Sequence, residues 1–394
     1  MRTIMIRTID PIVPESQIHT RKGRFSVQLE IPPESTLTAQ DIDNILAYAS
    51  WDRDPNTAEG KEGGRSILIS RERPRALKGL ELKALQVSGI GSVPMEFRVG
   101  SAFSTLPDAL LTPPSSDNFM KGLPGTIMTT TRVREGRLYN SKPDYRARGT
   151  YTEPELQMKV QKTRKAAKLS LESLTASPLE AVGRYLDDEL QDKKGGQFGF
   201  MVVPTPSVHQ ERIMGQIYKT YAHELENAPE SLNAQQIFML LYNICGAALG
   251  QIYPALKDLH ENGRHVHLQP HLSNMYSMQN GIYMMDWSTL EELRGKPDDR
   301  LRARFIDVRI PIQNVQNTFA QALGMNQEAR EKIDPVLIEL GLELYRGGDD
   351  EIKFESLLWR AREAGVQPRD HADVMVQWMR DEGYEGFPNM FPRR

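Results

Sequence analysis

The feature that most constrains the fold of this chain is the polar stretch between His267 and Asp286. Asn274 lies seven residues after His267, and Asp286 lies twelve residues after Asn274. The segment between the Asn and the Asp ends in a short hydrophobic run, which predicts a strand that finishes at Asp286. Amide and carboxylate oxygens are ligands that Mg²⁺ accepts. The spacing therefore predicts a loop and a strand end that converge on one divalent ion.

The patterns on either side of this stretch predict an α+β protein. Hydrophobic residues recur every three to four positions from Asn233 to His260, which predicts a long core-facing helix that Gly263 ends. Thr152 and Glu155 have the spacing of a capping box at the start of a shorter helix. The predicted strands are 25–31, 66–70, 80–87 and 198–204 with a hairpin over 126–139, and the predicted helices are 41–51, 152–173, 178–191, 233–260 and weaker ones at 312–323, 335–346, 351–364 and 370–382.

The length of 394 residues is enough for two domains with cores of their own. We expect an N-terminal extension over residues 1–45, a β-rich lobe over 46–205 and a helical lobe over 206–394. The boundary is placed where prolines follow the apolar strand at 198–204. An insertion in the first lobe, at about 100–150, is expected because 104–125 is rich in Pro, Ser, Thr and Gly.

Composition and charge exclude several classes of protein. The net charge of -3 gives no electrostatic case for binding nucleic acid. The single cysteine, Cys245, excludes an internal disulfide framework and is expected to be a small buried hydrophobe. No stretch reaches the ~20 apolar residues of a membrane span, and the N-terminus has no apolar core for a secretory signal. We expect a cytoplasmic protein; an effector exported without such a signal would have the same features.

The order of these elements resembles that of the protein-kinase-like superfamily over roughly residues 50–310. Within it, Leu259-His-Glu-Asn-Gly-Arg-His-Val-His267 is similar to the segment that begins the catalytic loop of aminoglycoside-phosphotransferase-like kinases. The resemblance implies a bilobal fold that binds ATP with Mg²⁺ between its lobes. It also implies that Asn274 and Asp286 hold the metal, and that His267 is structural and joins the loop to the metal-binding segment.

Gln269 stands where the family has its catalytic Asp, and this is the main departure from the family pattern. An amide cannot take up a proton, so Gln269 cannot be a general base, and we expect it to contact substrate or nucleotide. Phosphoryl transfer depends mainly on positioning and charge stabilisation, so catalysis is still compatible with this residue. The selenoprotein O family, which transfers AMP to protein hydroxyls, is similar in lacking the Asp and keeping the Asn and the later Asp. This chain has no Cys or selenocysteine near its C-terminus, unlike that family.

The resemblance also implies a phosphate-binding lysine and a helical glutamate that orients it. Lys83, on the alternating strand at 80–87, is the candidate lysine, and Lys78 is the alternative. Glu155 is the candidate glutamate, and Glu153 is the alternative. The other interpretation of Lys83 is a solvated residue on a strand, and the other interpretation of Glu155 is the capping box alone.

Glycines before the strand at 66–70 are candidates for the loop that covers the nucleotide. Gly63 and Gly64, with Gly60, precede this strand, and Gly89 and Gly91 follow the strand at 80–87. The full glycine motif of nucleotide-binding loops is missing, so an ordinary turn explains these residues equally well.

Two further patterns have chemical alternatives. The spacing of His265, His267 and His271 could place two imidazoles on one face of a strand, as in cupin-like metal sites, although a cupin requires β-structure where the chain has a long helix. The other interpretation is that these histidines are packing, loop or surface residues. A group of arginines could bind an acidic partner or phosphate, or form the solvated face of a hairpin. These arginines are Arg132, Arg134, Arg137, Arg146 and Arg148.

The sequence therefore predicts an atypical ATP-dependent transferase that moves a phosphoryl or adenylyl group to a hydroxyl of a protein or small molecule. The alternative is a pseudokinase that binds nucleotide or a partner without turnover. The retained Asn274 and Asp286 favour the transferase, and Gln269 favours the pseudokinase. The acceptor is not encoded in any pattern of this chain.

Overall fold

The computed structural model describes residues 8–62, 66–90, the strands within 125–147, and residues 150–187, 196–210, 212–227 and 234–295, together with scattered positions from 297 to 345. The chain divides into two compact units. Unit 1 comprises Met1–Thr130, Ser141–Lys168 and Ser177–Gln210, and unit 2 comprises Thr131–Asn140, Leu169–Ala176 and Glu211–Arg394. Both units contain helices and strands, so the predicted mixture of helix and sheet is confirmed.

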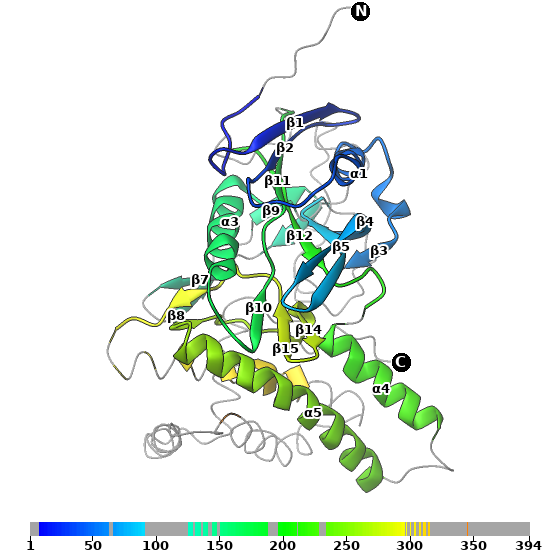
Figure 1. Ribbon diagram of the computed structural model, residues 1–394, viewed down its shortest axis with the longest axis vertical. Coiled ribbons are helices and arrows are strands. Elements are labelled where there is room, and N and C mark those ends of the chain that lie inside the picture. Colours follow the sequence, from blue (N-terminus) through cyan, green and yellow to red (C-terminus); the bar gives the residue numbers. More distant parts are fainter. Residues whose placement is uncertain are drawn as a thin grey trace, which may run out of the picture. The chain divides into compact units, whose positions relative to one another are not determined.

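Unit 1 is built on a seven-stranded antiparallel sheet in the order β1-β2-β11-β12-β5-β4-β3 (Figure 1). The strands are β1 (Gln17–Lys22), β2 (Ser26–Ile31), β3 (Gly60–Glu62), β4 (Ser66–Leu77), β5 (Leu80–Ser88), β11 (Ala181–Tyr185) and β12 (Gly199–Thr205). β2 pairs directly with β11, so the described part of the predicted N-terminal extension over residues 1–45 contributes β1 and β2 to this sheet. The predicted strands at 25–31, 66–70, 80–87 and 198–204 are confirmed.

One face of this sheet is apolar and is covered by α1 (Ala39–Ala49), the helix predicted at 41–51. Leu85 and Val87 of β5 and Ile45 of α1 belong to the same cluster of buried residues. Thr38 caps α1 through a reciprocal capping box with Asp41, which satisfies two backbone donors at the start of the helix. A short turn of 3₁₀ helix, η1 (Pro55–Thr57), follows α1.

The opposite face of the sheet packs against α3 (Glu153–Ala167). Gly199 of β12 lies on this face, because Val203, four residues further along the strand, pairs with Gln86 of β5. A Cβ on Gly199 would lie 2.5 Å from a methyl carbon of Leu156 in α3, so only glycine permits this close approach. The polar residues of β5 that alternate with Leu85 and Val87 therefore face α3.

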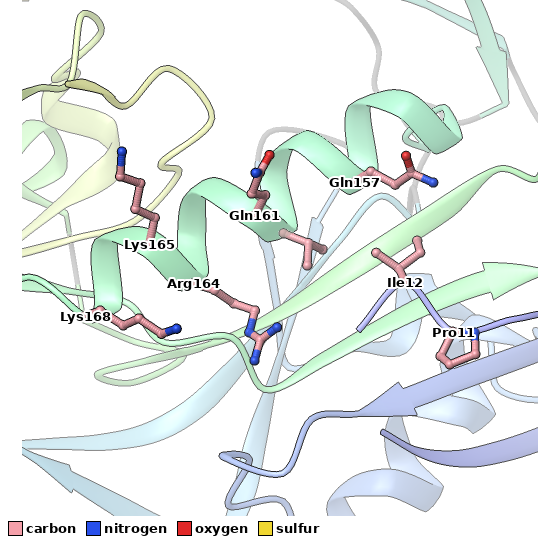
Figure 2. Close-up of a pocket in the computed structure, with 8 residues that line it drawn as sticks. Pro11, Ile12, Gln157, Gln161, Arg164, Lys165 and Lys168 are labelled. Carbon is pink, nitrogen blue, oxygen red and sulfur yellow. The ribbon is translucent and has the colours of Figure 1, made fainter. Parts of the chain in front are cut away.

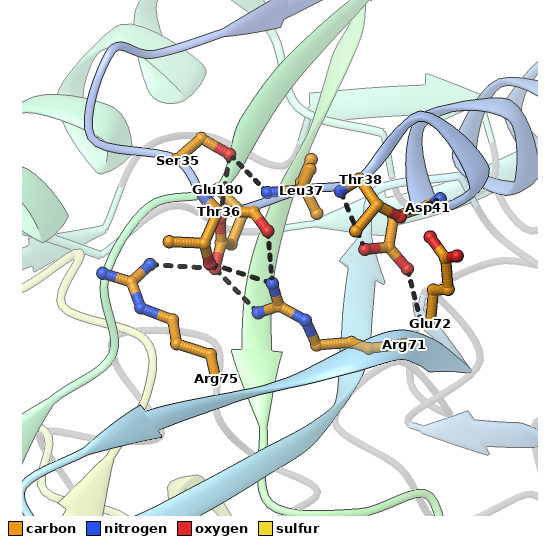
Figure 3. A network of polar contacts seen from close by, with 9 residues as sticks. All are labelled: Ser35, Thr36, Leu37, Thr38, Asp41, Arg71, Glu72, Arg75 and Glu180. Atoms are coloured by element: carbon orange, nitrogen blue, oxygen red, sulfur yellow. Dashed lines mark hydrogen bonds and ion pairs between the residues drawn. The ribbon is translucent and has the colours of Figure 1, made fainter.

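Glu180 anchors the start of β11 through a buried polar network (Figure 3). Its carboxylate accepts hydrogen bonds from Ser35 Oγ at 2.9 Å, Thr36 N at 2.8 Å and Thr36 Oγ1 at 3.0 Å. Arg71 and Arg75 each pair with the same carboxylate at 2.8 Å. Burial opposes ionisation of Glu180, but the Thr36 N–H and the two guanidiniums outweigh it and lower the pKa of Glu180 below its ordinary value.

Two of the predicted helices are corrected by unit 1. The helix predicted over 178–191 is wrong, because 181–185 forms β11, whose five residues are buried on both faces. A buried central strand has no polar alternation, and its apolar run is easily mistaken for a helical one. The helix predicted over 152–173 ends at Ala167, and Thr152 makes no side-chain capping bond, so the predicted capping box with Glu155 is also wrong.

Unit 2 contains the helices α4 (Ile213–Glu226) and α5 (Ala234–Glu261) beside short strands (Figure 1). The long helix predicted over 233–260 is confirmed as α5. Gly263 lies just after its end, where a Cβ would be 2.7 Å from the Leu259 carbonyl oxygen and would clash with the last turn of the helix. Cys245 is fully buried in α5, as predicted, and burial raises the pKa of its thiol to about 12. None of the described helices combines the length and apolar character needed to cross a bilayer.

The short strands of unit 2 place the loop around Asn274. β14 (Met275–Met278) and β15 (Gly281–Met284) form an antiparallel hairpin, and β10 (Leu174–Ala176) pairs in parallel with β15. β13 (His265–Val266) pairs with β16 (Glu291–Glu292), and η3 (Leu272–Asn274) is a turn of 3₁₀ helix before β14. Asp258 of α5 accepts hydrogen bonds from Glu172 N at 2.6 Å and Ser173 N at 2.7 Å, which fixes the segment leading to β10.

The hairpin predicted over 126–139 is described at the level of its backbone. β7 (Thr131–Arg134) pairs with β8 (Arg137–Asn140), and Arg134 lies opposite Arg137 as the predicted turn requires. A separate pair joins β6 (Gly125–Met128) to β9 (Asp144–Ala147). The predicted loop at 104–125, apart from its last residue, and most of the helical patterns after 312 lie outside the described residues.

Candidate functional site

The two predicted metal ligands are brought close together within unit 2 by the β14–β15 hairpin. Met275 pairs with Met284, and the Met285 N–H donates to the Asn274 carbonyl oxygen at 2.9 Å. Asp286 follows directly, so the backbones of Asn274 and Asp286 are neighbours at the open end of the hairpin. Both residues are half-buried, and their amide and carboxylate oxygens are a donor set that fits a magnesium ion.

His267 links the loop to the residue that ends this hairpin. Its Nε2 lies 2.8 Å from the Asp286 carbonyl oxygen, so the Nε2–H donates to that carbonyl. Its Nδ1 accepts from the Gln269 N–H at 3.3 Å and lies 3.4 Å from Thr289 Oγ1, which fits the same tautomer. The ring also contacts Trp287 at a centroid distance of 5.1 Å. These contacts join the loop at His267 to the residue that ends the hairpin.

Asp307 holds the backbone of the same loop and was not singled out in the sequence. It is fully buried, and its carboxylate accepts from His267 N at 2.7 Å and from Leu268 N. His260, at the end of α5, places Nε2 2.9 Å from the same carboxylate and Nδ1 2.7 Å from Tyr345 Oη. A charged acceptor shared by two loop amides and a histidine fixes the loop firmly on the helix.

The loop carries backbone strain that these contacts maintain. Leu268 has φ +64° and Asp286 has φ +52°, both in the left-handed region that residues other than glycine rarely occupy. Each such residue costs about 1–2 kcal/mol relative to ordinary backbone. Strained positions of this kind concentrate at functional sites, where surrounding bonds over-determine them. Leu268 follows His267 in the sequence, and the Asp286 carbonyl oxygen contacts the His267 ring.

Arg212 and His271 support the turn η3 that leads to Asn274. The Arg212 guanidinium donates to the Ser273 carbonyl and lies 5.7 Å from the centroid of the Tyr276 ring. His271 caps η3, with Nδ1 accepting from the Ser273 N–H at 3.1 Å. Burial, and secondarily the positive charge of Arg212, lower the pKa of His271 to about 4. His271 is therefore neutral at physiological pH and acts as an acceptor here.

Gln269 lies within the same loop. Its N–H donates to His267 Nδ1, and its carbonyl accepts from the His271 N–H at 2.8 Å. The side chain is half-buried. The backbone thus fixes the position of this residue, while its amide retains the chemistry expected from the sequence: it can donate and accept hydrogen bonds but cannot take a proton.

The three histidines of the alternative metal site do not converge. His265 Nδ1 contacts the Gly263 carbonyl, His267 binds the Asp286 carbonyl, and His271 caps η3. Among the residues that the structure describes, no group of three or more His, Cys, Asp or Glu side chains could share a metal ion. The cupin-like alternative is therefore corrected: these rings position backbone.

The structure does not bring Lys83 and Glu155 together. Lys83 is 57% exposed and pairs with Glu81 at 2.9 Å. It lies on the same face of β5 as Leu85, the face that α1 covers, whereas Glu155 is on α3 and α3 packs on the other face. Because side chains alternate between the two faces of β5, Lys83 lies on the face of the sheet opposite to the one that carries Glu155.

The other members of that prediction are also described. Lys78 is exposed in the turn between β4 and β5 with φ +46°, and Glu153 lies 3.6 Å from Arg184. Lys159, which the sequence did not single out, lies one helical turn after Glu155 and is almost fully buried. Its Nζ stands 5.1 Å from the centroid of the Tyr151 ring. Lys159 is the one buried lysine of α3 and is therefore a further candidate lysine.

The predicted glycine loop and the arginine group are only partly within the described chain. Gly63, Gly64 and Gly91 lie outside the described residues. Gly60 starts β3, and Gly89 follows β5 with φ +103° and packs against Gly199, which explains it as a backbone contact. The side chains of the arginines on β7, β8 and β9 are likewise outside the description.

Comparison with known proteins adds a distant likeness. No protein-family model and no curated protein matches the chain. It resembles the Toxoplasma gondii specific rhoptry antigen kinase domain with 12% identity and a TM-score of 0.30, over 60% of this chain and 84% of that one. It resembles a rhoptry kinase from Toxoplasma gondii with 12% identity and a TM-score of 0.28, over 55% and 72%. At these scores the likeness carries no conclusion about activity or substrate.

Proposed function

We propose that this chain is an atypical protein of the kinase-like superfamily that binds ATP with Mg²⁺ and transfers a phosphoryl or adenylyl group to a hydroxyl. The single observation that carries the proposal is the contact from His267 to the Asp286 carbonyl, at the end of a hairpin whose other strand directly follows Asn274. The order α3, β12, α5, loop and β15 supports the same superfamily.

The residues of the chain have separate roles in this proposal. Asn274 and Asp286 would hold the metal, and His267 and Asp307 would hold the loop that presents them. When bound, magnesium ATP would supply either its γ-phosphoryl group, with ADP leaving, or its adenylyl group, with pyrophosphate leaving. Gln269 would orient the acceptor or the nucleotide through hydrogen bonds, and the proton of the acceptor hydroxyl would pass to solvent.

A pseudokinase is the second candidate, and two observations favour it. Gln269 has no proton-accepting group, and Lys83 pairs with Glu81 rather than with a glutamate of α3. A chain of this kind would still bind the nucleotide through Asn274 and Asp286 and would act through a partner instead of by turnover. Lys83 and Lys159 are the two candidates for a lysine that contacts the phosphates of the nucleotide.

Incubation with ATP labelled at the α- or the γ-phosphate separates the alternatives. Label transferred from the α-position alone indicates adenylylation, label from the γ-position alone indicates phosphorylation, and no covalent label in the presence of measurable ATP binding indicates the pseudokinase.

We expect transfer to be lost in Asp286→Asn and retained in Asn280→Ala, an exposed residue of the β14–β15 turn. Loss in Lys159→Met but not in Lys83→Met would assign the phosphate contact to Lys159, and the reverse would assign it to Lys83. Absence of both label and binding refutes the proposal.

A further inference from the structure

A groove within unit 1 is lined by residues of α3 and of the N-terminal segment (Figure 2). Its volume is about 630 Å³, and one wall is the N-terminal segment at Pro11 and Ile12. Val160, which is 3% exposed, lines it from α3 as an apolar floor. The polar lining comes from α3 and the residue that follows it: Gln157, Gln161, Arg164, Lys165 and Lys168.

The N-terminal wall of the groove is fixed by the polar side chains of the sheet. Gln28 of β2 accepts from Ile9 N at 2.9 Å and donates to Ile9 O at 2.8 Å. Glu30 accepts from Ile12 N at 2.7 Å and pairs with Arg184 at 2.6 Å, and Arg184 in turn donates to the Asp10 carbonyl. Gln28, Glu30 and Arg184 are buried, so the wall is held in place before any ligand arrives.

The charge along the groove is graded. The lining positions recur every three to four residues and so follow one face of the helix, with amides toward its N-terminus and cations toward its C-terminus. From Gln157 to Lys168 the face is about 16 Å long, which matches about five residues of extended chain. The whole chain has a net charge of -3, so this cationic stripe is a local feature.

The chain itself shows that a carboxylate is accepted beside the stripe. Arg164 Nε pairs with Glu34 at 2.8 Å, with both side chains partly exposed. Cations in the last turn also stabilise a helix through its dipole, which explains Arg164 and Lys165 in part. The dipole does not account for the two glutamines, the apolar floor or the fixed opposite wall, which together form a place for a second chain.

We propose that this groove docks an extended acidic segment of a partner protein. The segment has neutral residues beside Gln157 and Gln161, whose amides hydrogen-bond its backbone, and carboxylates or phosphates beside Lys165 and Lys168. The site uses no residue of the Asn274–Asp286 hairpin, so it stands or falls independently of the proposed transferase. Carboxylate and phosphate share the chemistry that the cations recognise, and the experiment below distinguishes them.

The test is fluorescence anisotropy of the full chain with labelled peptides of one length at low salt. One half of each peptide is neutral, and the other half carries three glutamates, three phosphoserines or three glutamines. We expect the acidic peptides to bind and the glutamine peptide to bind at least 10-fold more weakly. Tighter binding of the phosphoserine peptide assigns phosphate, and equal binding of the two acidic peptides assigns carboxylate.

Variants of the chain locate the binding. Lys168→Glu should weaken the acidic peptides about 5-fold and Lys165→Glu/Lys168→Glu about 20-fold, since each reversal replaces an attraction by a repulsion. Lys22→Glu, an exposed lysine of β1 in the same unit, should change binding less than 2-fold. Glu34→Gln releases Arg164 from its internal carboxylate and should strengthen binding about 2-fold, a gain that misfolding cannot imitate.

The proposal is overturned if the glutamine peptide binds as tightly as the acidic ones, or if Lys165→Glu/Lys168→Glu leaves binding unchanged. A single-stranded oligonucleotide serves as the competing anion. Binding of the oligonucleotide but of no peptide, with loss in the same double variant, would also overturn it and would assign the groove to nucleic acid. Circular dichroism of each variant confirms that the chain is folded.

Discussion

Replacing Asp307 by Asn should release the loop that carries His267 and Gln269. The carboxylate accepts two loop amides and contacts His260, whereas an Asn side chain has one accepting oxygen. At least one buried N–H then loses a charged acceptor, which costs about 1.5–3 kcal/mol. The left-handed backbone of Leu268 is present in both chains and does not add to the difference. We therefore expect local opening of the loop to become easier by about 1.5–3 kcal/mol.

The assay is native-state hydrogen exchange of peptides that cover the loop. A change of about 1.5–3 kcal/mol corresponds to exchange about 10- to 150-fold faster. Asp258→Asn is the matched control, because Asp258 is also a buried acid of unit 2 that accepts two backbone N–H groups, those of Glu172 and Ser173. It should accelerate exchange at 172–173 and leave the loop unchanged. Unchanged loop exchange in Asp307→Asn, or equal acceleration in both variants, would refute the reasoning.

Four further predictions concern ionisable groups that are buried or partly buried. Glu180→Gln should destabilise unit 1 by about 3–5 kcal/mol in urea unfolding, because it leaves Arg71 buried without its counter-ion. The control is Glu34→Gln at an exposed ion pair, which should cost less than about 1 kcal/mol. Equal destabilisation by the two variants would contradict the stabilising role of the Glu180 network. The pKa of Glu180 is lower in the folded chain than in the unfolded chain. The stability that its carboxylate contributes should therefore be fully present above the ordinary pKa of about 4.3 and be lost as pH falls through the lower folded pKa. Glu180→Gln should not show this pH dependence. His271, with a pKa lowered to about 4, should make thermal unfolding pH-dependent between about 6.5 and 4, with stability falling as pH falls, and His271→Asn should remove that slope. Cys245 should resist alkylation by iodoacetamide in the native chain and react only after denaturation; rapid native labelling would contradict its burial and raised pKa.

Local patterns in the sequence predicted the elements whose character is set locally. The long helix at 234–261 and the strand at 80–88 follow from hydrophobic periodicity and alternation, and both are observed. The strand at 181–185 was missed because it is central, between β2 and β12, and all five of its residues are buried, so its sequence has no polar alternation. Its anchor, Glu180, is held by Arg71 and Arg75, more than 100 residues away along the chain.

The same distinction explains which contacts around the candidate site were predictable. Asn274 and Asp286 are joined by a hairpin formed entirely from the residues between them, so their spacing carries the information. Asp307 contacts amides about 40 residues earlier, and the only local signal is a single acid within the run Phe305-Ile-Asp-Val308. The Lys83 pairing was not predictable, because alternation defines two faces of a strand but not which helix covers each face.

The most direct test of the central claim is binding of Mn²⁺ in place of Mg²⁺, measured by electron paramagnetic resonance with and without ATP. We predict that the wild-type chain binds Mn²⁺ with ATP and that Asn274→Ala and Asp286→Asn weaken this binding at least 10-fold, while Asn280→Ala does not. Asp286→Asn is preferred to alanine because asparagine tolerates the left-handed backbone at this position. Equal binding of Mn²⁺ and ATP by all four chains, or none by the wild type, would contradict the assignment of Asn274 and Asp286.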